Sequence, residues 1–425
     1  MSGLAKFCLT QGKTVSGSDK VVSNVIRKLA SLGASVYSGH SESNVIGAEL
    51  VVYSSAIDES NPELNYAVKH KIPIVKRSEL LGEILALHKR TIGISGSHGK
   101  TTVTAMISEI FIAADFNPTV FLGGERKTFG NFRLGGNAFA IAEACEYKRN
   151  FLDMRCDISV VLNVDHDHVD TYKTIDDAVS AFSAFTKNTF CILNADDDNA
   201  RRIFNACTVT FGIKNLAAYR AKYISNAECR AFTVYAYGKK LGRIKLKIAG
   251  EHNVYNALAA ITVATECGVP FKIIQKTLGE FDGVKRRNEY LGEFMGVACY
   301  ADYAHHPTEI SALLKDKTVK TLAVFQPHTY SRTAALKDDF ISALRLADGI
   351  IIYKTYPARE KFKKSGDGKT LYYKIRETGV KDLSYADSQV ALKTELKARV
   401  ASYDKIIFIG AGDIYSIAKS VVAAQ

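Results

Sequence analysis

The chain has 425 residues, of which 47% are hydrophobic and 24% are charged, and its formal net charge at pH 7 is +12. This length exceeds one ordinary core and predicts about two to four domains, and the composition is that of a soluble globular protein. No apolar run approaches the roughly 18 residues that cross a bilayer, so we expect no membrane insertion. The first residues lack the apolar core and cleavage site of a secretory signal, which indicates a cytoplasmic protein.

The eight cysteines contain no Cys-x-x-Cys pair, so neither a zinc ribbon nor a disulfide framework is expected. We interpret them as small buried hydrophobic residues in a reducing compartment. The positive net charge suits nucleic acid or polyanionic small molecules equally well. The densest basic stretch, residues 356–369, is interrupted by proline, glycine and acidic residues, which is typical of an exposed loop. We therefore expect no nucleic-acid partner.

In the first part of the chain, short β-rich runs alternate with helical patterns, and this alternation predicts a parallel sheet. The β-rich runs are residues 14–20, 34–39, 49–57 and 72–76. The helical patterns are residues 21–33, which end at a glycine, and 61–71.

Two further α/β blocks follow, one starting near Arg90 and one after residue 291. Each strand candidate has a polar cluster at or just past its end, which is where ligands bind in open parallel sheets. The candidate strands lie within residues 138–145, 157–170, 189–196, 298–310, 320–328, 348–356 and 405–414. Residues 251–269 form an alanine-rich pattern typical of a buried helix ending at Gly268.

Residues 93–105, GISGSHGKTTVTA, join an apolar stretch to a helical pattern through a glycine-rich turn. In such a turn, backbone N–H groups and the helix N-terminus surround phosphate. Lys100 is then expected to reach the β- and γ-phosphates, and Thr101 to bind Mg²⁺. The common phosphate-loop pattern places a glycine where this chain has Ile94. The alternative is an ordinary glycine-containing turn, but the strand, the helix and the Lys-Thr-Thr run together favour phosphate.

Acidic residues and histidines follow two strand candidates. Glu143 and Glu146 come after the first, and a cluster of alternating acids and histidines comes after the second. Carboxylates and imidazoles at neighbouring strand ends suit a second Mg²⁺. Polar loop residues are the alternative, which we favour for Asp165 or His166 alone. For Glu143 and His168 we expect a metal role.

Three other polar segments have a structural and a functional interpretation. EHNVYN (251–256) caps a helix or meets a ligand, and DYAHHPTEI (302–310) is a solvated loop before a proline-started helix or a substrate site. FQPHTYSRT (325–333) strengthens the substrate interpretation of the paired histidines. VKRR (284–287) is a basic turn or a phosphate clamp at a domain junction.

Eight segments, in order and spacing, resemble the Mur ligase family: GSHGKTT, AEACE, NVDHDHVD, EHNVYNALAA, GVKRRNE, DYAHHPTEI, FQPHTYSRT and GAGDI. The family loop is Gly-x-x-Gly-Lys-Thr-Thr, so Gly96 is the glycine that matters and Ile94 is no defect. DYAHHPTEI with FQPHTYSRT most resembles the branch that adds L-alanine to UDP-N-acetylmuramate in peptidoglycan synthesis.

The resemblance implies an α/β fold of three domains, which we expect at residues 1–89, 90–285 and 286–425. They would be a Rossmann-like UDP-sugar-binding domain, a central P-loop ATPase domain and a Rossmann-like amino-acid-binding domain. The implied reaction uses ATP and Mg²⁺ to form an acyl phosphate on the muramoyl carboxylate, which the amine of L-alanine then attacks. No oligomeric state is implied.

The resemblance also implies roles for individual residues. The nucleotide would be bound by Gly96, Ser97, His98, Gly99, Lys100, Thr101, Thr102, His252, Asn253, Asn256, Arg286 and Asp302. The metal ligands would be Thr101, Glu143 and His168. The reacting groups would be faced by Lys100, His305, His306 and Arg332.

Two departures from the family pattern bear on the expectation. Residues 178–185 contain no lysine, whereas several relatives carry a carbamylated lysine there; this agrees with the alanine-adding branch. The family's first domain opens with a strand and a Gly-x-Gly-x-x-Gly run, of which residues 1–5 resemble only the tail, so we expect the first strand to be missing and UDP-sugar binding to be weakened. Two alternatives remain: a ligase that recycles murein tripeptide, and a catalytically weakened nucleotide-binding remnant.

Overall fold

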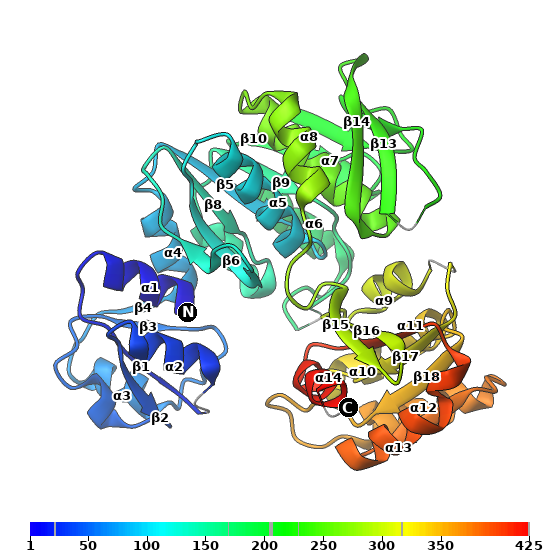
Figure 1. Cartoon of the computed structure of the whole chain (residues 1–425). Helices are drawn as coiled ribbons and strands as arrows, with labels where there is room; N and C mark the ends of the chain where they lie inside the picture. Colours follow the sequence, from blue (N-terminus) through cyan, green and yellow to red (C-terminus); the bar gives the residue numbers. More distant parts are fainter. Residues whose placement is uncertain (21–22, 169, 204–206, 228, 316–317, 424–425) are drawn as a thin grey trace. The chain divides into compact units, whose positions relative to one another are not determined.

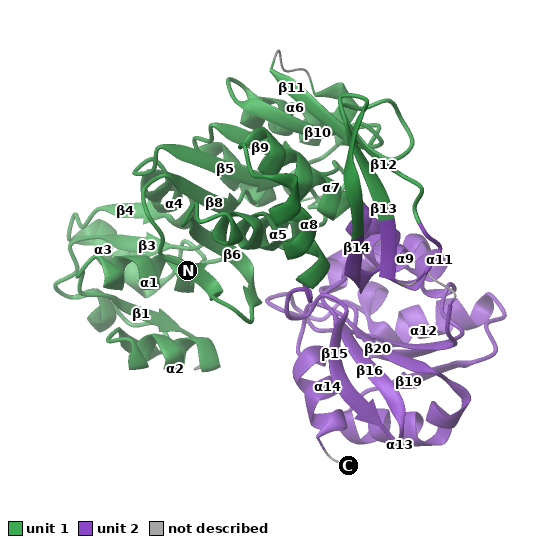
Figure 2. Cartoon of the chain, turned by 45° about the horizontal axis from the view of Figure 1, so that its top comes forward, with its two compact units in different colours: residues 1–224, 232–244, 255–280 green, residues 225–231, 245–254, 281–425 purple. Residues whose placement is uncertain are grey.

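The computed structural model describes residues 1–20, 23–168, 170–203, 207–227, 229–315 and 318–423. The chain forms two compact units (Figure 2). The first comprises residues 1–224, 232–244 and 255–280, and the second comprises residues 225–231, 245–254 and 281–425. Within the described ranges, no helix combines the length and the apolar character needed to cross a membrane.

The N-terminal segment of the first unit contains two separate parallel strand pairs, β1 with β2 and β3 with β4 (Figure 1). Its elements are α1 (Ser2–Thr10), β1 (Ser16–Asp19), α2 (Asn24–Ser31), β2 (Ser35–Ser38), β3 (Val51–Tyr53), α3 (Pro62–Lys69), β4 (Ile74–Lys76) and α4 (Arg77–Leu85). The helix predicted at 21–33 begins only at Asn24, because the Ser23 hydroxyl accepts a hydrogen bond from Ile26 N as an N-cap. Residues 21 and 22 of that prediction lie outside the described residues.

A ten-stranded sheet carries the central part of the chain, in the order β14-β13-β12-β11-β10-β9-β5-β8-β6-β7. Its strands are β5 (Arg90–Ser95), β6 (Thr119–Arg126), β7 (Gly130–Arg133), β8 (Phe139–Glu143), β9 (Ile158–Val161), β10 (Phe190–Asn194), β11 (Thr208–Gly212), β12 (Tyr219–Lys222), β13 (Cys229–Ala236) and β14 (Lys239–Ala249). Its helices are α5 (Lys100–Ala113), α6 (Ile175–Thr186), α7 (Glu251–Glu266) and α8 (Phe271–Glu280).

The middle of this sheet is parallel and apolar because helices cover it. In β9 all four residues, Ile158–Val161, are buried, and in β5 only Arg90 is exposed. Strands buried on both faces read as continuous hydrophobic runs. β8 and β9 both pair with β5, so the carboxyl ends of these three strands meet at one edge of the sheet. The residues that follow them are therefore brought together.

The second unit contains a six-stranded sheet in the order β15-β16-β20-β17-β18-β19. Its strands are β15 (Glu289–Phe294), β16 (Val297–Asp302), β17 (Thr321–Phe325), β18 (Gly349–Tyr353), β19 (Leu383–Ala386) and β20 (Lys405–Ile409). Its helices are α9 (Pro307–Leu314), α10 (Tyr330–Ala335), α11 (Lys337–Leu344), α12 (Gly368–Glu377), α13 (Gln389–Arg399) and α14 (Ile414–Val422). Core clusters of buried residues lie around these strands.

Two expectations from the sequence need correction. The parallel sheet predicted for the first part of the chain is instead two separate parallel strand pairs. The two larger sheets, for which no strand direction was predicted, are mixed, because β7 pairs antiparallel with β6, β13 with β12, and β15 with β16. The cysteines all have free thiols, but of the eight only Cys191 and Cys299 are buried; five are partly buried and Cys207 is exposed.

Candidate active site

The turn after β5 has the geometry of a phosphate-binding loop. β5 ends at Ser95, α5 begins at Lys100, and Gly96 and Gly99 have φ of 140° and 87°. A Cβ at Gly99 would lie 2.6 Å from Asn256 Oδ1, and one at Gly96 would lie 2.9 Å from the Leu162 Cβ. Both positions therefore require glycine, for space as well as for backbone conformation. The first-turn N–H groups of α5 have no partner inside the helix and suit an anion.

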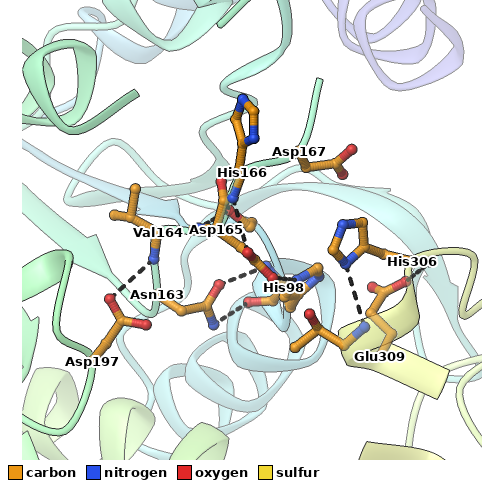
Figure 3. Close-up of polar contacts among 12 residues, drawn as sticks. His98, Asn163, Val164, Asp165, His166, Asp167, Asp197, His306 and Glu309 are labelled. Atoms are coloured by element: carbon orange, nitrogen blue, oxygen red, sulfur yellow. Dashed lines mark hydrogen bonds and ion pairs between the residues drawn. The ribbon is translucent and has the colours of Figure 1, made fainter. Parts of the chain in front are cut away.

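Asn163, two residues after the end of β9, binds the same turn (Figure 3). Its Oδ1 accepts from His98 N at 2.8 Å and its Nδ2 donates to His98 O at 3.1 Å. His98 Nε2 and Asp165 Oδ2 lie 3.2 Å apart. Sequence reasoning missed Asn163; its place at a buried strand end was the available signal.

Lys100 lies against its own loop. Its ammonium donates to the carbonyls of Gly96 and Ser97, the latter at 3.1 Å, and to Glu146 Oε1 at 2.9 Å. Burial is the largest single influence and acts to lower the pKa of Lys100, but the charge and hydrogen bond of Glu146, together with the charges of Cys145 and Glu143, outweigh it and the pKa is raised. Burial likewise acts to raise the pKa of Glu146, and Lys100 and His168 hold that pKa below its usual value. The two groups form a charged, buried pair.

The three predicted metal ligands form two separate sets of contacts. The Thr101 hydroxyl donates to Glu143 Oε2 at 2.9 Å, and Gly123 N donates to Glu143 Oε1. His168 Nε2 instead lies 3.6 Å from Glu146 Oε1 and 3.7 Å from Asp167 Oδ2. Thr101 and Glu143 thus bring oxygen ligands together beside the loop, which suits a hard cation.

The start of α7 is divided between the units. Asn256 is buried and belongs to the first unit, where it lies against Gly99. His252 and Asn253 belong to the second, where Asn253 Nδ2 donates to Ala249 O at 2.6 Å. Burial lowers the pKa of His252 to about 4. In the described part of the chain, His252 Nδ1 is buried without a hydrogen-bond partner.

In the second unit, Arg286 is ordered by two aromatic rings. Its guanidinium lies 4.6 Å from the Tyr303 ring centroid and 5.2 Å from that of Tyr415, and it donates to Gly412 O at 3.1 Å. Asp302, at the end of β16, accepts from Ala304 N at 2.7 Å and Asn288 N at 2.6 Å. Burial raises the pKa of Asp302.

The paired histidines differ in their surroundings. His306 is 5% exposed and caps α9: its Nδ1 accepts from Thr308 N at 3.4 Å, and Glu309 Oε2 accepts from His306 N in return (Figure 3). This is a helix-capping arrangement, so the structural interpretation suits His306 better than His305. The His305 ring faces that of His328, with 6.0 Å between the ring centroids.

His328 belongs to the FQPHTYSRT segment but was not among the predicted site residues. Its ring stacks on Tyr356 with 5.6 Å between the centroids, and burial lowers its pKa to about 4. Arg332, on α10, is partly exposed in the same segment. The unit therefore groups two histidines and a tyrosine at the ends of β16, β17 and β18.

Three family models match the chain. They are described as "Mur ligase family, catalytic domain" at residues 1–89, "Mur ligase middle domain" at 94–264 and "Mur ligase, glutamate ligase domain" at 286–412. Among curated proteins, the UDP-N-acetylmuramate–L-alanine ligase of Clostridium novyi is 40% identical, with 100% of this chain and 95% of that protein covered. The protein of the same name from Clostridium acetobutylicum is 41% identical, with 98% and 94% covered.

Solved structures agree with these matches. The UDP-N-acetylmuramate-alanine ligase of Thermotoga maritima has a TM-score of 0.86 at 28% identity, covering 100% of this chain and 96% of that one. A murein peptide ligase from Psychrobacter arcticus has a TM-score of 0.75 at 22% identity over 100% and 96%, which shows a shared fold. With three domain models in chain order and full-length relatives near 40% identity, this chain belongs to the Mur ligase family and has its three-domain α/β architecture.

Proposed function

We propose that this ligase joins L-alanine to UDP-N-acetylmuramate at the expense of ATP, giving UDP-N-acetylmuramoyl-L-alanine for peptidoglycan synthesis. The observation that carries the proposal is the loop with Lys100 and Thr101 beside Glu143, in a chain about 40% identical over its full length to proteins of that activity. Membership of an ATP-dependent family supports ATP as the nucleotide.

The chemistry follows from the poor reactivity of a carboxylate. Its oxygen attacks the γ-phosphorus of ATP and ADP departs, leaving an acyl phosphate. The alanine amine then attacks the acyl carbon, inorganic phosphate leaves, and the nitrogen loses a proton. Lys100 and the N–H groups of α5 stabilise the negative charge on the phosphate oxygens. Arg286 and Asp302 would contact the nucleotide, as would His252, Asn253 and Asn256 near its base.

Mg²⁺ fits the pair formed by Thr101 and Glu143, because both offer oxygen ligands and already lie in contact. His168, which lies beside Glu146 and Asp167, would be the third ligand. When bound, the ion would neutralise phosphate charge. His305 and Arg332 would face the reacting carboxylate and the amino acid; His306 was predicted with them, although its capping contacts favour a structural role. We propose that the UDP-sugar-binding domain comprises residues 1–89, the ATP-binding domain residues 90–285 and the amino-acid-binding domain residues 286–425.

The test is inorganic phosphate release with ATP, Mg²⁺, UDP-N-acetylmuramate and one of several amino acids. We expect release with L-alanine well above that with glycine, L-serine or D-alanine, and the product mass of one added alanine. A parallel reaction in which murein tripeptide replaces the amino acid tests the alternative, a ligase that recycles this tripeptide. Faster release with tripeptide, or no release with any acceptor, would refute the assignment.

A further inference from the structure

We propose that Glu146 is a positioning residue of the phosphate loop, which holds Lys100 on the loop while no nucleotide is bound and orients His168 beside it. The inference rests on the proposed function, since it takes residues 96–102 as the site of ATP phosphates. Glu146 would not touch the nucleotide; it would act through Lys100 and His168.

The Glu146 side chain is placed for this by its burial and its backbone. It is 3% exposed, and its Oε1 lies 2.9 Å from Lys100 Nζ and 3.6 Å from His168 Nε2. Its carbonyl accepts from the Tyr172 hydroxyl at 2.6 Å and from Arg149 N at 2.9 Å. Tyr172 is itself 1% exposed, so the backbone that carries the carboxylate is fixed in the core.

The contacts of Lys100 show what a phosphate would have to displace. An ammonium has three donor positions. Here they meet the Gly96 carbonyl, the Ser97 carbonyl and Glu146, and only the last acceptor is charged. A phosphate that recruits Lys100 must therefore compete with the Glu146 carboxylate.

Glu146 also has an unused acceptor. Its Oε2 is buried and has no hydrogen-bond partner among the described residues, while Oε1 makes the contacts with both Lys100 and His168. Buried acceptors are seldom left unpaired, and an unpaired one calls for an explanation. A carboxylate that changes partners when Lys100 moves to a phosphate supplies one.

Two effects of opposite sign follow for Glu146→Gln. Removing the charge frees Lys100 from its strongest partner and removes repulsion toward phosphate, so nucleotide without metal should bind more tightly. The same change removes one of the two carboxylates beside His168 and leaves only that of Asp167, so turnover with Mg²⁺ should fall. A residue with only a structural role would weaken both when replaced.

The experiment measures ATP affinity by calorimetry in EDTA and turnover in Mg²⁺, on the full chain. For Glu146→Gln we expect the affinity for ATP without metal to rise about tenfold, equivalent to about 1.4 kcal/mol, and the turnover with Mg²⁺ to fall about tenfold. The control is Glu83→Gln, the same change on the exposed face of α4, which should move neither quantity.

Unchanged or weaker metal-free ATP binding in a folded Glu146→Gln would overturn the inference. If that variant does not fold, Glu146→Asp carries the same test: it keeps the charge but shortens the side chain, and should bind metal-free ATP more tightly than the parent by a smaller factor. Equal affinities would then overturn the inference. Failure of the parent chain to bind ATP with Mg²⁺ would instead overturn the proposed function.

Discussion

Replacing Lys100 by methionine separates its role in catalysis from its role in stability. Lys100→Met keeps the aliphatic length of the side chain and removes the ammonium, which contacts two loop carbonyls and Glu146. We expect two losses, because the ammonium stabilises phosphate charge in the proposed mechanism and pairs with the Glu146 carboxylate in the fold.

The catalytic loss is that of a group aimed at developing charge. Such a group is worth about 2.7–4 kcal/mol, so kcat should fall by roughly 10²–10³-fold. The loss of stability comes from Glu146, which is 3% exposed and keeps only the weaker contact with His168 at 3.6 Å. Breaking a buried ion pair on one side costs about 3–5 kcal/mol. At about 2–4 °C per kcal/mol, the Tm should fall by roughly 6 °C or more.

The assay pairs phosphate release with thermal unfolding for three chains: the parent, Lys100→Met and Lys100→Met/Glu146→Gln. Because the double variant leaves no buried charge unpaired, its Tm should recover most of the loss while its kcat stays low. Turnover of Lys100→Met within tenfold of the parent would refute the role of Lys100 in the reaction. A Tm equal to that of the parent would refute the buried pair.

Three other changes test separate parts of the site. Arg332→Lys should raise the KM for L-alanine, because the bidentate fork of the guanidinium is lost, with much less effect on the KM for ATP; a change confined to ATP would assign Arg332 to the nucleotide. Gly99→Ala should raise the KM for ATP about tenfold or more, because it adds backbone strain at φ 87° and a clash with Asn256. The control is Gly130→Ala, where φ is 73° and no atom lies within 4 Å of the added Cβ; it adds the strain alone and should leave the KM for ATP unchanged. Burial lowers the pKa of His328 from 6.5 to about 4, so the unfolded chain binds the proton more readily and acidification from pH 6.5 toward 4 should destabilise the fold. The fall in Tm between pH 6.5 and 5 should therefore be smaller in His328→Asn than in the parent. An identical fall would show that His328 is not the group responsible.

The sequence predicted a glycine-rich turn between a strand and a helix, and it named Thr101 and Glu143 as expected metal ligands; the hydrogen bond between these two side chains is a finding of the structure. The turn is a local pattern, with an apolar strand, two glycines and a helix in one stretch of residues. The nearness of the two ligands follows from topology, because the ends of adjacent parallel strands meet. Neither the turn nor this nearness needs any knowledge of distant side chains.

The partnership of Glu146 with Lys100 was not predictable in this way. Glu146 lies three residues beyond β8, just before a turn in which Lys148 and Arg149 both adopt positive φ, 50° and 57°. No pattern in AEACEYKRNFL shows that turn, and it decides where the carboxylate lies. The hairpin between β13 and β14 does have a signal in the sequence, because Gly238 follows Tyr237 at its two-residue turn, where φ is 49° and 80°. Consecutive positive φ is the mark of the turns that join antiparallel strands.

The position of Arg286 shows why a basic run cannot be interpreted from its own residues. Gly283, Arg286 and Asn288 all have positive φ, and for the two that are not glycine this conformation costs about 1–2 kcal/mol each. The contacts that offset this cost all come from the C-terminal unit: Glu289 accepts from Arg286 N, Tyr303 N donates to Arg286 O, and Asp302 accepts from Asn288 N.

The guanidinium of Arg286 is fixed by the same unit, between the rings of Tyr303 and Tyr415 and against the carbonyls of Gly410 and Gly412. Its order is thus determined by residues 17 to 129 positions away, in the segments after β16 and β20 and at the start of α14, and not by VKRR itself. A solvated basic turn and an arginine held in one position have the same local sequence, and only the distant aromatic residues distinguish them.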